Sequence, residues 1–442
     1  MIMCSRCFKM NARVSFYKET KFKEAQLGRI PEDWKTAKIS KLFNLYKGTT
    51  PSTKIKEYWN GKIPFVTPTD ITRVSNLNKI YLRETEKYIT EKGLASKNLK
   101  LIPANSLLFT SRATIGYLAI NDVKVTINQG VISLMPKDKN VETTFFYYLF
   151  QRLRSLFESL AGGSTYKEIS MSTFSDIEIY LPSVSEQKTI AHILLTVDKA
   201  IQKTNEIIEK TERLKKGLME ELLTKGIGHK EFKDTEIGKI PKEWNIVRLG
   251  KALELCQYGL SIPMKNEGKY PIIRMDEIVD GYVSPKISKF VDLDEKTLKT
   301  FRLEKGDILF NRTNAYELVG RTGIFLLDGD YVFASYLIRL RPKPNMFDSH
   351  FLTYYLIFIN KKLKRLATKA VHQANINATN LRKVKIPRPS LDEQRKIVKI
   401  LLAVDKKLKM ERVEKQRLEK IKQALMDLLL TGKVRVKVNE GA

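Results

Sequence analysis

The sequence predicts an α+β fold with two similar globular domains, each followed by a long helix, and with the two helices paired as an antiparallel coiled coil. First, the segment 182–187 returns at 389–394, and the offset (389 − 182 = 207) holds as far as Thr224 and Thr431. Second, a long helical pattern follows each copy. Third, mixed strand and helix patterns precede each copy. A repeat of about 200 residues has the length of a domain plus a helix, which indicates a gene duplication.

Each copy of the repeat opens a long helix. Proline ends the preceding strand, and Ser185 and Asp392 are residue types that favour an N-cap. Apolar residues then recur at alternating spacings of three and four, as in the seam of a coiled coil. The predicted seam contains Ile190, Leu194, Val197 and Ile201 in the first helix and Ile397, Leu401, Val404 and Leu408 in the second, and the first seam continues through Leu214.

A helix of this length with one apolar stripe needs a partner, and the other copy is the obvious candidate. A compact pseudo-dimer favours an antiparallel pair with a globular domain at each end. The alternative is that each helix packs only on its own domain.

The domains are expected to be α+β because short β-branched runs alternate with two aromatic-rich helical patterns, 143–160 and 351–366. Trp34 and Trp244 stand at the end of a matching phrase in each half and are expected to anchor the two cores. The expected order is an N-terminal extension (1–26), a first domain (27–181), a first long helix (182–226), a second domain (227–388), a second long helix (389–432) and a C-terminal tail (433–442).

Charge is the outlying feature of the composition. With 79 Lys and Arg against 49 Asp and Glu, the net charge is +30, which favours a polyanionic partner, with nucleic acid the commonest. The alternative is a Lys-rich surface that serves heat resistance or solubility, but such surfaces usually balance Lys with Glu. Cys4, Cys7 and Cys256 form no disulfide framework, and no segment is long and apolar enough to be a signal peptide or membrane span. We therefore expect a cytoplasmic protein.

Loops at matching positions in the two halves differ in length and chemistry, as two different recognition tasks require. Hydroxyls and backbone N–H groups at 48–52 suit phosphates, arginines suit guanine edges, and amides suit adenine. The candidate DNA-binding residues are Lys47, Gly48, Thr49, Thr50, Ser52, Ser111, Arg112, Thr114, Thr165, Tyr166 and Lys167 in the first domain, and Tyr258, Arg274, Asn311, Arg312, Thr313, Asn314, Arg321, His372, Gln373 and Asn375 in the second. The alternative for each of these residues is that it is an ordinary polar loop residue with no contact to DNA.

Catalytic signatures are missing. The sequence contains no phosphate-binding Gly-x4-Gly-Lys-Ser/Thr loop, no dinucleotide-binding glycine pattern and no amino-methyltransferase tetrad. The four histidines do not have metal-ligand spacing, and the carboxylates of 292–295 are expected to form a solvated turn and helix start. These observations favour a binding protein that is not itself an enzyme, with no catalytic residues, metal or cofactor of its own.

The sequence resembles the specificity subunits of type I restriction–modification systems. The resemblance is carried by Gly-Thr-Thr-Pro-Ser at 48–52, the phrase at 57–64, the loop at 162–170 and the Pro-x-x-x-Glu-Gln-x-x-Ile phrase at 182–190 and 389–397. The second half departs from it at 258–263, which lacks the Gly-Thr-Thr-Pro phrase.

The resemblance implies that each globular domain is a target-recognition domain that reads one half of a bipartite, asymmetric double-stranded DNA site. It implies that the coiled coil sets the gap between the halves and that two adenine-methyltransferase subunits, which use S-adenosylmethionine, dock on the chain. Motor–endonuclease subunits that use ATP and Mg²⁺ are the further partners it allows.

Three other classes remain open: a fused single-chain restriction endonuclease, a nucleic-acid-binding scaffold without sequence preference, and a coiled-coil adaptor whose charge is incidental. The first would cleave plasmid DNA with Mg²⁺ alone. The second would lose affinity steeply with salt and ignore base sequence. The third would bind no duplex.

Overall fold

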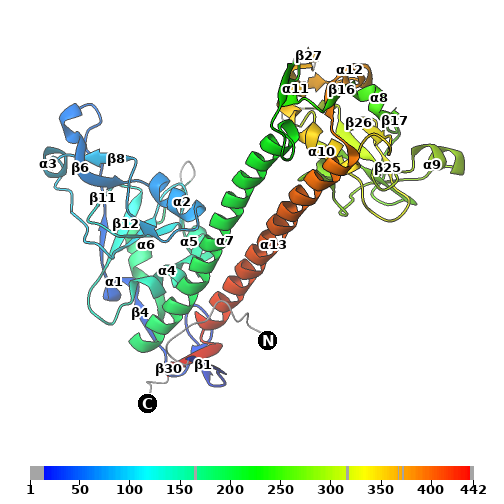
Figure 1. The fold of residues 1–442 in the computed structure, drawn as a ribbon. Helices are drawn as coiled ribbons and strands as arrows, with labels where there is room; N and C mark the ends of the chain where they lie inside the picture. Colours follow the sequence, from blue (N-terminus) through cyan, green and yellow to red (C-terminus); the bar gives the residue numbers. More distant parts are fainter. Residues whose placement is uncertain (1–13, 164–166, 315–317, 367, 371–372, 439–442) are drawn as a thin grey trace. The chain divides into compact units, whose positions relative to one another are not determined.

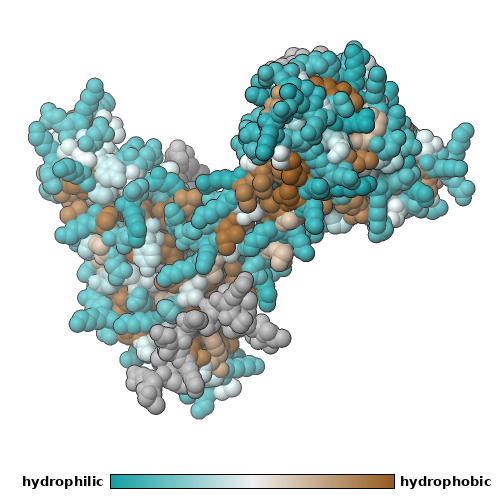
Figure 2. Space-filling model, in the orientation of Figure 1, coloured by the Kyte–Doolittle hydropathy of each residue, from teal (hydrophilic) through white to brown (hydrophobic). Residues whose placement is uncertain are grey.

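The structure, a computed structural model, describes residues 14–163, 167–314, 318–366, 368–370 and 373–438 (Figure 1). The chain forms two compact units, of which the first contains residues 1–207 and 411–442 and the second residues 208–410. Hydrophilic side chains cover most of the visible face of each globular part, as the excess of charged residues predicts (Figure 2). No helix among the described residues is long and apolar enough to cross a membrane.

The centre of the first unit is a five-stranded sheet in which only β7 runs parallel to its neighbour. Its order is β5 (Phe43–Lys47), β12 (Val131–Pro136), β9 (Leu107–Thr110), β10 (Leu118–Asn121) and β7 (Tyr81–Leu82). Because side chains alternate along β9, Leu107 and Phe109 join the core that contains helix α4 (Thr143–Arg152), while Leu108 joins the core that contains α2 (Pro68–Asn76). The sheet therefore has an apolar core on each face.

A smaller sheet and two short ribbons complete the first domain. The sheet has the order β11 (Thr126–Ile127), β6 (Trp59–Val66) and β8 (Lys87–Ile89). Strand β4 (Lys35–Lys38) pairs with β13 (Glu178–Leu181), the strand just before the first long helix. The stretch expected to be one helix at 143–160 is two, α4 and α5 (Arg154–Ser159).

The second unit repeats this plan. Its six-stranded sheet has the order β17 (Leu253–Tyr258), β26 (Leu337–Pro342), β22 (Ile308–Asn311), β24 (Thr322–Ile324), β20 (Tyr282–Val283) and β19 (Ile278–Val279). The smaller sheet is β21 (Phe290–Val291), β18 (Tyr270–Ile273) and β25 (Val332–Phe333), and β16 (Asn245–Arg248) pairs with β29 (Lys385–Arg388). Ile308 and Phe310 pack with α10 (Ser349–Phe358), while Leu309 joins a core on the other face. The internal duplication is thus visible in the fold.

The two long helices are α7 (Val184–Thr224) and α13 (Leu391–Leu429), and they pack together antiparallel (Figure 1). In the first unit, the start of α7 and the end of α13 share one apolar core, which contains Ile190, Leu194, Val197, Ile201, Leu418, Leu425 and Leu429. In the second unit, the end of α7 and the start of α13 do so through Met219, Leu222, Leu223, Ile397 and Leu401. Val404 is partly buried and Leu408 is buried.

Two details of the predicted helices are wrong. Leu214 is 56% exposed and so lies outside the seam. The helices begin one residue before Ser185 and Asp392, and the hydroxyls of Ser183 and Ser390 accept the N–H groups of Glu186 and Glu393 at 3.3 Å. Serine therefore supplies the N-terminal contact in both copies, two residues earlier than expected.

The repeated Glu-Gln phrase holds each domain on its helix. The Gln187 amide donates to the carbonyls of Asn140 and Pro182, and its oxygen accepts from the N–H of Glu142, all within 3.1 Å. Gln394 makes the three equivalent bonds in the second unit. The glutamates accept the indole N–H groups of the two buried tryptophans: Trp34 donates to Glu186 at 3.0 Å and Trp244 to Glu393 at 2.9 Å. The expectation that these tryptophans anchor the cores is confirmed.

The chain ends differ from the expected extension and tail. Strand β1 (Val14–Lys18) pairs antiparallel with β30 (Val434–Val438), with Phe16 opposite Val436. Strand β2 (Phe22–Lys23) then pairs with β3 (Ile30–Pro31). Residues 14–23 and 434–438 therefore belong to the first domain. Sequence patterning missed them because the strands are short and their pairing partners lie at opposite ends of the chain.

Candidate nucleic-acid interface

In the first unit, four chain segments meet at one edge of the central sheet, where β5 and β9 end and β12 begins. Backbone hydrogen bonds join them: Gly48 N–H to the Val131 carbonyl at 3.4 Å, Ser111 N–H to Gly130 at 2.9 Å, and Ile169 N–H to the Ser111 carbonyl at 3.0 Å. Three of these segments (47–53, 110–116 and 162–169) carry all of the residues predicted to bind DNA in this domain. The structure therefore brings those predicted residues of the first domain that it describes to one place.

The second unit builds the same edge with the same bonds. Gly259 N–H donates to Leu337 at 3.2 Å, Arg312 N–H to the Tyr336 carbonyl at 3.0 Å, and Ile376 N–H to the Arg312 carbonyl at 2.8 Å. Strand β28 (Gln373–Asn375) pairs with β23 (Thr313–Asn314) and with β27 (Thr368–Ala370). Because β23 follows the edge residue Arg312, this pairing holds β27 and β28 against the edge. Most of the predicted residues of the second domain gather here.

The two edges present different side chains. In the first unit, Lys47 forms an ion pair with Glu168, and the hydroxyl of Thr50 hydrogen-bonds the side chain of Gln129. Thr49, Ser52, Thr114 and Lys167 are exposed, and Arg112 is half-buried. The charge of Lys47 is thus offset within the domain, while the hydroxyls and Lys167 face solvent.

A cavity of about 290 Å³ opens beside this edge, lined among others by Thr114, Lys167 and Arg154. The Arg154 guanidinium stacks 3.9 Å above the ring of Tyr117 and donates to Glu158 at 2.9 Å. Stacking and the ion pair fix the orientation of the guanidinium.

In the second unit, an arginine and a tyrosine take the centre of the edge. The guanidinium of Arg312 lies 4.8 Å from the centre of the Tyr258 ring, donates to the Ser335 carbonyl at 3.0 Å and contacts the Asn375 amide oxygen at 3.4 Å. The Tyr258 hydroxyl in turn accepts the N–H of Ala378 at 2.8 Å. A planar cation is therefore held in one orientation where the first unit has Ser111.

The other two predicted arginines have partners of their own. Arg274 pairs with Asp276 at 3.2 Å and contacts the hydroxyl of Ser288 at 3.4 Å. Arg321 approaches the carbonyl of Ile278 at 3.4 Å, although its own carbonyl accepts from Asn311 at the edge. Thr313 is half-buried and Asn375 exposed.

Three predicted contacts need correction. Gly48 has no free N–H, and a Cβ there would lie 1.9 Å from the Ile127 carbonyl oxygen, so this glycine allows two chain segments to touch. Gly259 has the same role in the second unit. The side chains of Ser111 and Asn311 are fully buried, and the Asn311 amide donates to the Leu318 carbonyl at 2.8 Å. The side chains of Ser111 and Asn311 therefore pack beneath the edge and do not face solvent. Thr165, Tyr166, His372 and the side chains of Asn314 and Gln373 lie outside what the structure describes.

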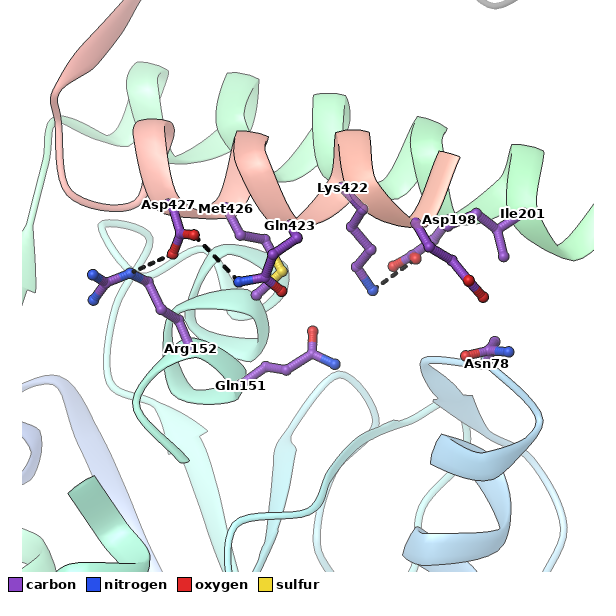
Figure 3. Close-up of a pocket in the computed structure, with 10 residues that line it drawn as sticks. Asn78, Gln151, Arg152, Asp198, Ile201, Lys422, Gln423, Met426 and Asp427 are labelled. Atoms are coloured by element: carbon purple, nitrogen blue, oxygen red, sulfur yellow. Dashed lines mark hydrogen bonds and ion pairs between the residues drawn. The ribbon is translucent and has the colours of Figure 1, made fainter. Parts of the chain in front are cut away.

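A cavity of about 390 Å³ lies between α4 and the two long helices in the first unit (Figure 3). Lys422 pairs with Asp198 at 2.8 Å, and Arg152 lies 3.6 Å from Asp427. Asp198 also accepts the hydroxyl of Tyr148 at 2.7 Å. These contacts join α4 to the two long helices, and we call this place the joint between the domain and its helices.

The second unit contains the reciprocal joint. Asp405 of α13 pairs with Lys215 of α7 at 2.6 Å and accepts the hydroxyls of Tyr354 at 2.6 Å and Tyr282 at 3.1 Å. Burial raises the pKa of Tyr282 to about 12 and that of Tyr354 further. Sequence reasoning missed both aspartates. The available signal was a single acidic residue at the same place in each apolar stripe, 207 residues apart (405 − 198).

Among the described residues, no group of three His, Cys, Asp or Glu side chains could hold a metal ion. The expectation for 292–295 is confirmed: Asp292 accepts from the Lys269 N–H at 3.0 Å, and Asp294 caps α9 (Glu295–Phe301) through the Thr297 N–H at 2.8 Å. The Lys265 ammonium holds the pKa of Asp292 below its ordinary value, and the Thr297 N–H does so for Asp294.

Comparison with known proteins agrees with this architecture. Residues 31–213 and 241–423 each match the family described as the type I restriction modification DNA specificity domain. The MjaIX type I restriction enzyme specificity subunit of Methanocaldococcus jannaschii is 32% identical over 453 residues, which cover 96% of this chain and 98% of that protein. The EcoKI specificity subunit of Escherichia coli is 23% identical over 336 residues, which cover 71% of this chain and 69% of that protein.

Among solved structures, the S subunit of a type I restriction–modification system from M. genitalium superposes with a TM-score of 0.57 at 19% identity, covering 90% of this chain and 96% of that one. This likeness concerns the fold. Since the family match covers both halves and the M. jannaschii relative aligns almost from end to end, the chain belongs to the family of type I restriction enzyme specificity subunits, which recognise DNA sequence.

Proposed function

We propose that this chain reads a bipartite, asymmetric double-stranded DNA site, one half with each globular domain. The observation that carries the proposal is the pair of edges described above: the same backbone hydrogen bonds build both, but Lys47, Glu168 and Lys167 line one where Tyr258 and Arg312 line the other. A shared scaffold with different side chains suits two half-sites of different sequence.

The charge of the chain supports DNA as the ligand. A net charge of +30 supplies the sequence-independent attraction to phosphates. Arg312 then supplies a planar donor suited to the O6 and N7 acceptors of guanine in the major groove. The exposed hydroxyls of Thr49 and Ser52 and the ammonium of Lys167 suit phosphate contacts in the first half-site.

The two long helices are proposed to set the spacer between the half-sites. Helix α7 has 41 residues and α13 has 39. At 1.5 Å per residue each is roughly 60 Å long, which exceeds the ~34–36 Å between half-sites one DNA turn apart. Each end of the pair carries its own joint, Asp198 with Lys422 and Asp405 with Lys215. A helix pair with such a joint in each unit can act as a ruler.

Catalysis is proposed to reside in partner subunits. Two methyltransferase subunits that use S-adenosylmethionine would dock on the chain, with motor–endonuclease subunits that use ATP and Mg²⁺ as further partners. The chain itself would bind no cofactor. A subunit that reads chromosomal DNA works where that DNA is, so the expected cytoplasmic location is part of this proposal.

The test is to map modified adenines in a host genome by single-molecule sequencing, with and without this gene. The expected result is a two-block motif with a fixed gap that disappears with the gene. Arg312→Ala should relax one block, with a loss of about 1–3 kcal/mol per lost base contact. Its matched control is Lys361→Ala, an exposed charge on α11 (Asn360–Leu363) away from the edge hydrogen bonds. Modification at a single continuous motif would refute the proposal. The absence of any modified adenine that depends on this gene would also refute it.

The ruler is tested by lengthening both helices at their centres. Inserting seven helical residues after residue 207 and seven after residue 410 leaves both aspartate joints in place. The insertion adds about 10 Å, or roughly three base pairs of spacer at 3.4 Å each. The control carries the insertion in one helix only and should lose binding, because the two helices then differ in length between the two aspartate joints, which cannot both form. Altered blocks at an unchanged gap would contradict the ruler.

A further inference from the structure

We propose that the C-terminal strand β30 seats the first domain on its helices through Arg435, which makes Arg435 a positioning residue for one half-site alone. This inference rests on the proposed two-part reading of DNA. It assigns a recognition role to chain ends that the sequence marks only as an extension and a tail.

Arg435 joins three parts of the first unit. Its side chain is 8% exposed, and its Nε and Nη2 donate to the two oxygens of Glu186 at 2.6 and 2.9 Å. Nη1 and Nη2 donate to Asp33 at 2.9 and 2.8 Å, and Nη1 also reaches Glu19 at 2.7 Å. The first turn of α7, the opening segment of the domain and the chain after β1 are thus held by one guanidinium that follows α13.

The Glu186 carboxylate is the centre of this arrangement. It is buried, and its only other side-chain donor among the described residues is the Trp34 indole, which also lies 5.6 Å under the Arg435 guanidinium. Without Arg435, a buried charge would remain uncompensated at the contact between the domain and α7. The domain would then leave this seat for a fraction of the time, and apparent affinity falls in proportion to the seated fraction.

The second unit achieves the same seat differently. Glu393 accepts the Trp244 indole at 2.9 Å and the Ile227 N–H at 3.0 Å, and its Oε1 lies 2.8 Å from His229 Nε2. His229 follows α7 directly, because the chain turns at Gly226 (φ 67°) and continues into the second domain.

After α13 the chain makes the same turn at Gly432 (φ 68°) and then enters β30. Strand β30 pairs with β1, and the N–H of Glu19, which follows β1, donates to the Lys433 carbonyl at 3.1 Å. The Val436 side chain is buried in the core of the first unit, with Val14 and Val434 packed against it. Strand β30 and the segment after β1, which are far apart in sequence, thus perform for the first domain what the connection after α7 performs for the second.

The experiment selects bound duplexes from a random pool with the full-length chain and compares the information content of the two blocks. Arg312→Ala marks which block belongs to the second domain. Arg435→Ala should raise the apparent Kd about tenfold and weaken only the first-domain block. His229→Ala is the matched variant and should weaken only the second. Arg435→Lys keeps the charge but not the planar guanidinium, so the information content of the first-domain block should lie between those of the wild type and Arg435→Ala.

A split chain gives a second readout. The chain that ends at residue 432 should lose the first-domain block, and a synthetic peptide of residues 433–442 should restore it. The same peptide with Arg435→Ala should not. A purely structural role for the tail would weaken both blocks together, and peptide rescue would then not depend on Arg435.

The outcomes separate two failures. If the wild-type chain selects no two-block motif, the proposed function is refuted and this inference with it. If the wild-type chain does select two blocks but Arg435→Ala leaves both unchanged, or weakens them equally, the positioning role of Arg435 is overturned while the proposed function stands.

Discussion

Replacing Asp405 with alanine should destabilise the second unit and leave the first unit largely intact. The Asp405 carboxylate is 12% exposed and has three partners, the Lys215 ammonium and the hydroxyls of Tyr354 and Tyr282. Its removal leaves an ammonium that is 19% exposed without a counter-charge and two phenols without an acceptor. Breaking one side of a buried ion pair costs about 3–5 kcal/mol.

A cost of about 3 kcal/mol raises the opening equilibrium roughly 150-fold. Native-state hydrogen exchange resolves this change by region, because local opening is reported amide by amide. Exchange should accelerate in α10 (Ser349–Phe358), which carries Tyr354, and remain unchanged in α4 (Thr143–Arg152). Asp405→Asn, which keeps an acceptor oxygen, should cost only about 1–2 kcal/mol.

The matched control is Asp198→Ala in the first unit, where Tyr148 and Lys422 are the partners. There the acceleration should appear in α4 and spare α10. If Asp405→Ala changes exchange in neither helix, or in both equally, the aspartates do not join each domain to its helices, and the reasoning fails.

Three further predictions concern stability. Gly48→Ala should lower the melting temperature, with a loss of about 2 kcal/mol or more of stability, because its Cβ meets the Ile127 carbonyl. Gly217→Ala, on the open face of α7, should raise the melting temperature, with a gain of about 0.5–1 kcal/mol. Thermal melts in which both variants shift in the same direction would contradict this reasoning. Arg435 lowers the pKa of Asp33, so the Asp33 carboxylate stabilises the fold at pH values above its ordinary pKa of 3.8, and this stability is lost as the pH falls through the lower folded-state pKa. The acid unfolding curves of the wild type and of Arg435→Ala should therefore converge at that low pH. Curves that stay parallel would refute the link. Burial raises the pKa of Tyr282 from 10.0 to about 12, so the stability that this side chain contributes is complete below pH 10 and is lost between pH 10 and about 12. In urea titrations, Tyr282→Phe should therefore lower the free energy of unfolding less at pH 11 than at pH 9. An equal decrease at both pH values would exclude this cause.

The long helices and the duplicated domains could be predicted because their signals are periodic and repeated. An apolar stripe over a helix of 41 residues and a constant offset between the halves leave few alternatives for either. The antiparallel pairing followed from compactness alone, and the shared apolar cores at both ends confirm it.

The edges were partly predictable. The loops that diverge between the halves do meet where strands end, because the antiparallel pairing of β12 with β5 and β9 brings their ends to one edge. Which side chains face outward was not predictable, since burial depends on close approaches that sequence does not encode locally. Gly48 suggested a phosphate loop but lies against the Ile127 carbonyl, and Asn311 suggested a base contact but is fully buried.

The joints could not be predicted because their partners are distant in sequence. Arg435 contacts Glu19 across almost the whole chain, and Asp405 meets Lys215 from the opposite helix. The repeated Glu-Gln phrase signalled a shared role, but its partners, a tryptophan indole and two backbone carbonyls in each copy, became apparent only in the structure.

The discontinuity of the first unit has a consequence for biosynthesis. Residues 208–410 form the second unit as one uninterrupted segment, which can fold as soon as the ribosome has released it. The first unit begins to leave the ribosome earlier but lacks the segment from residue 411 onward, including the strand that carries Arg435, until that segment has also been synthesised. The unit that begins to emerge first is therefore completed only after the second unit.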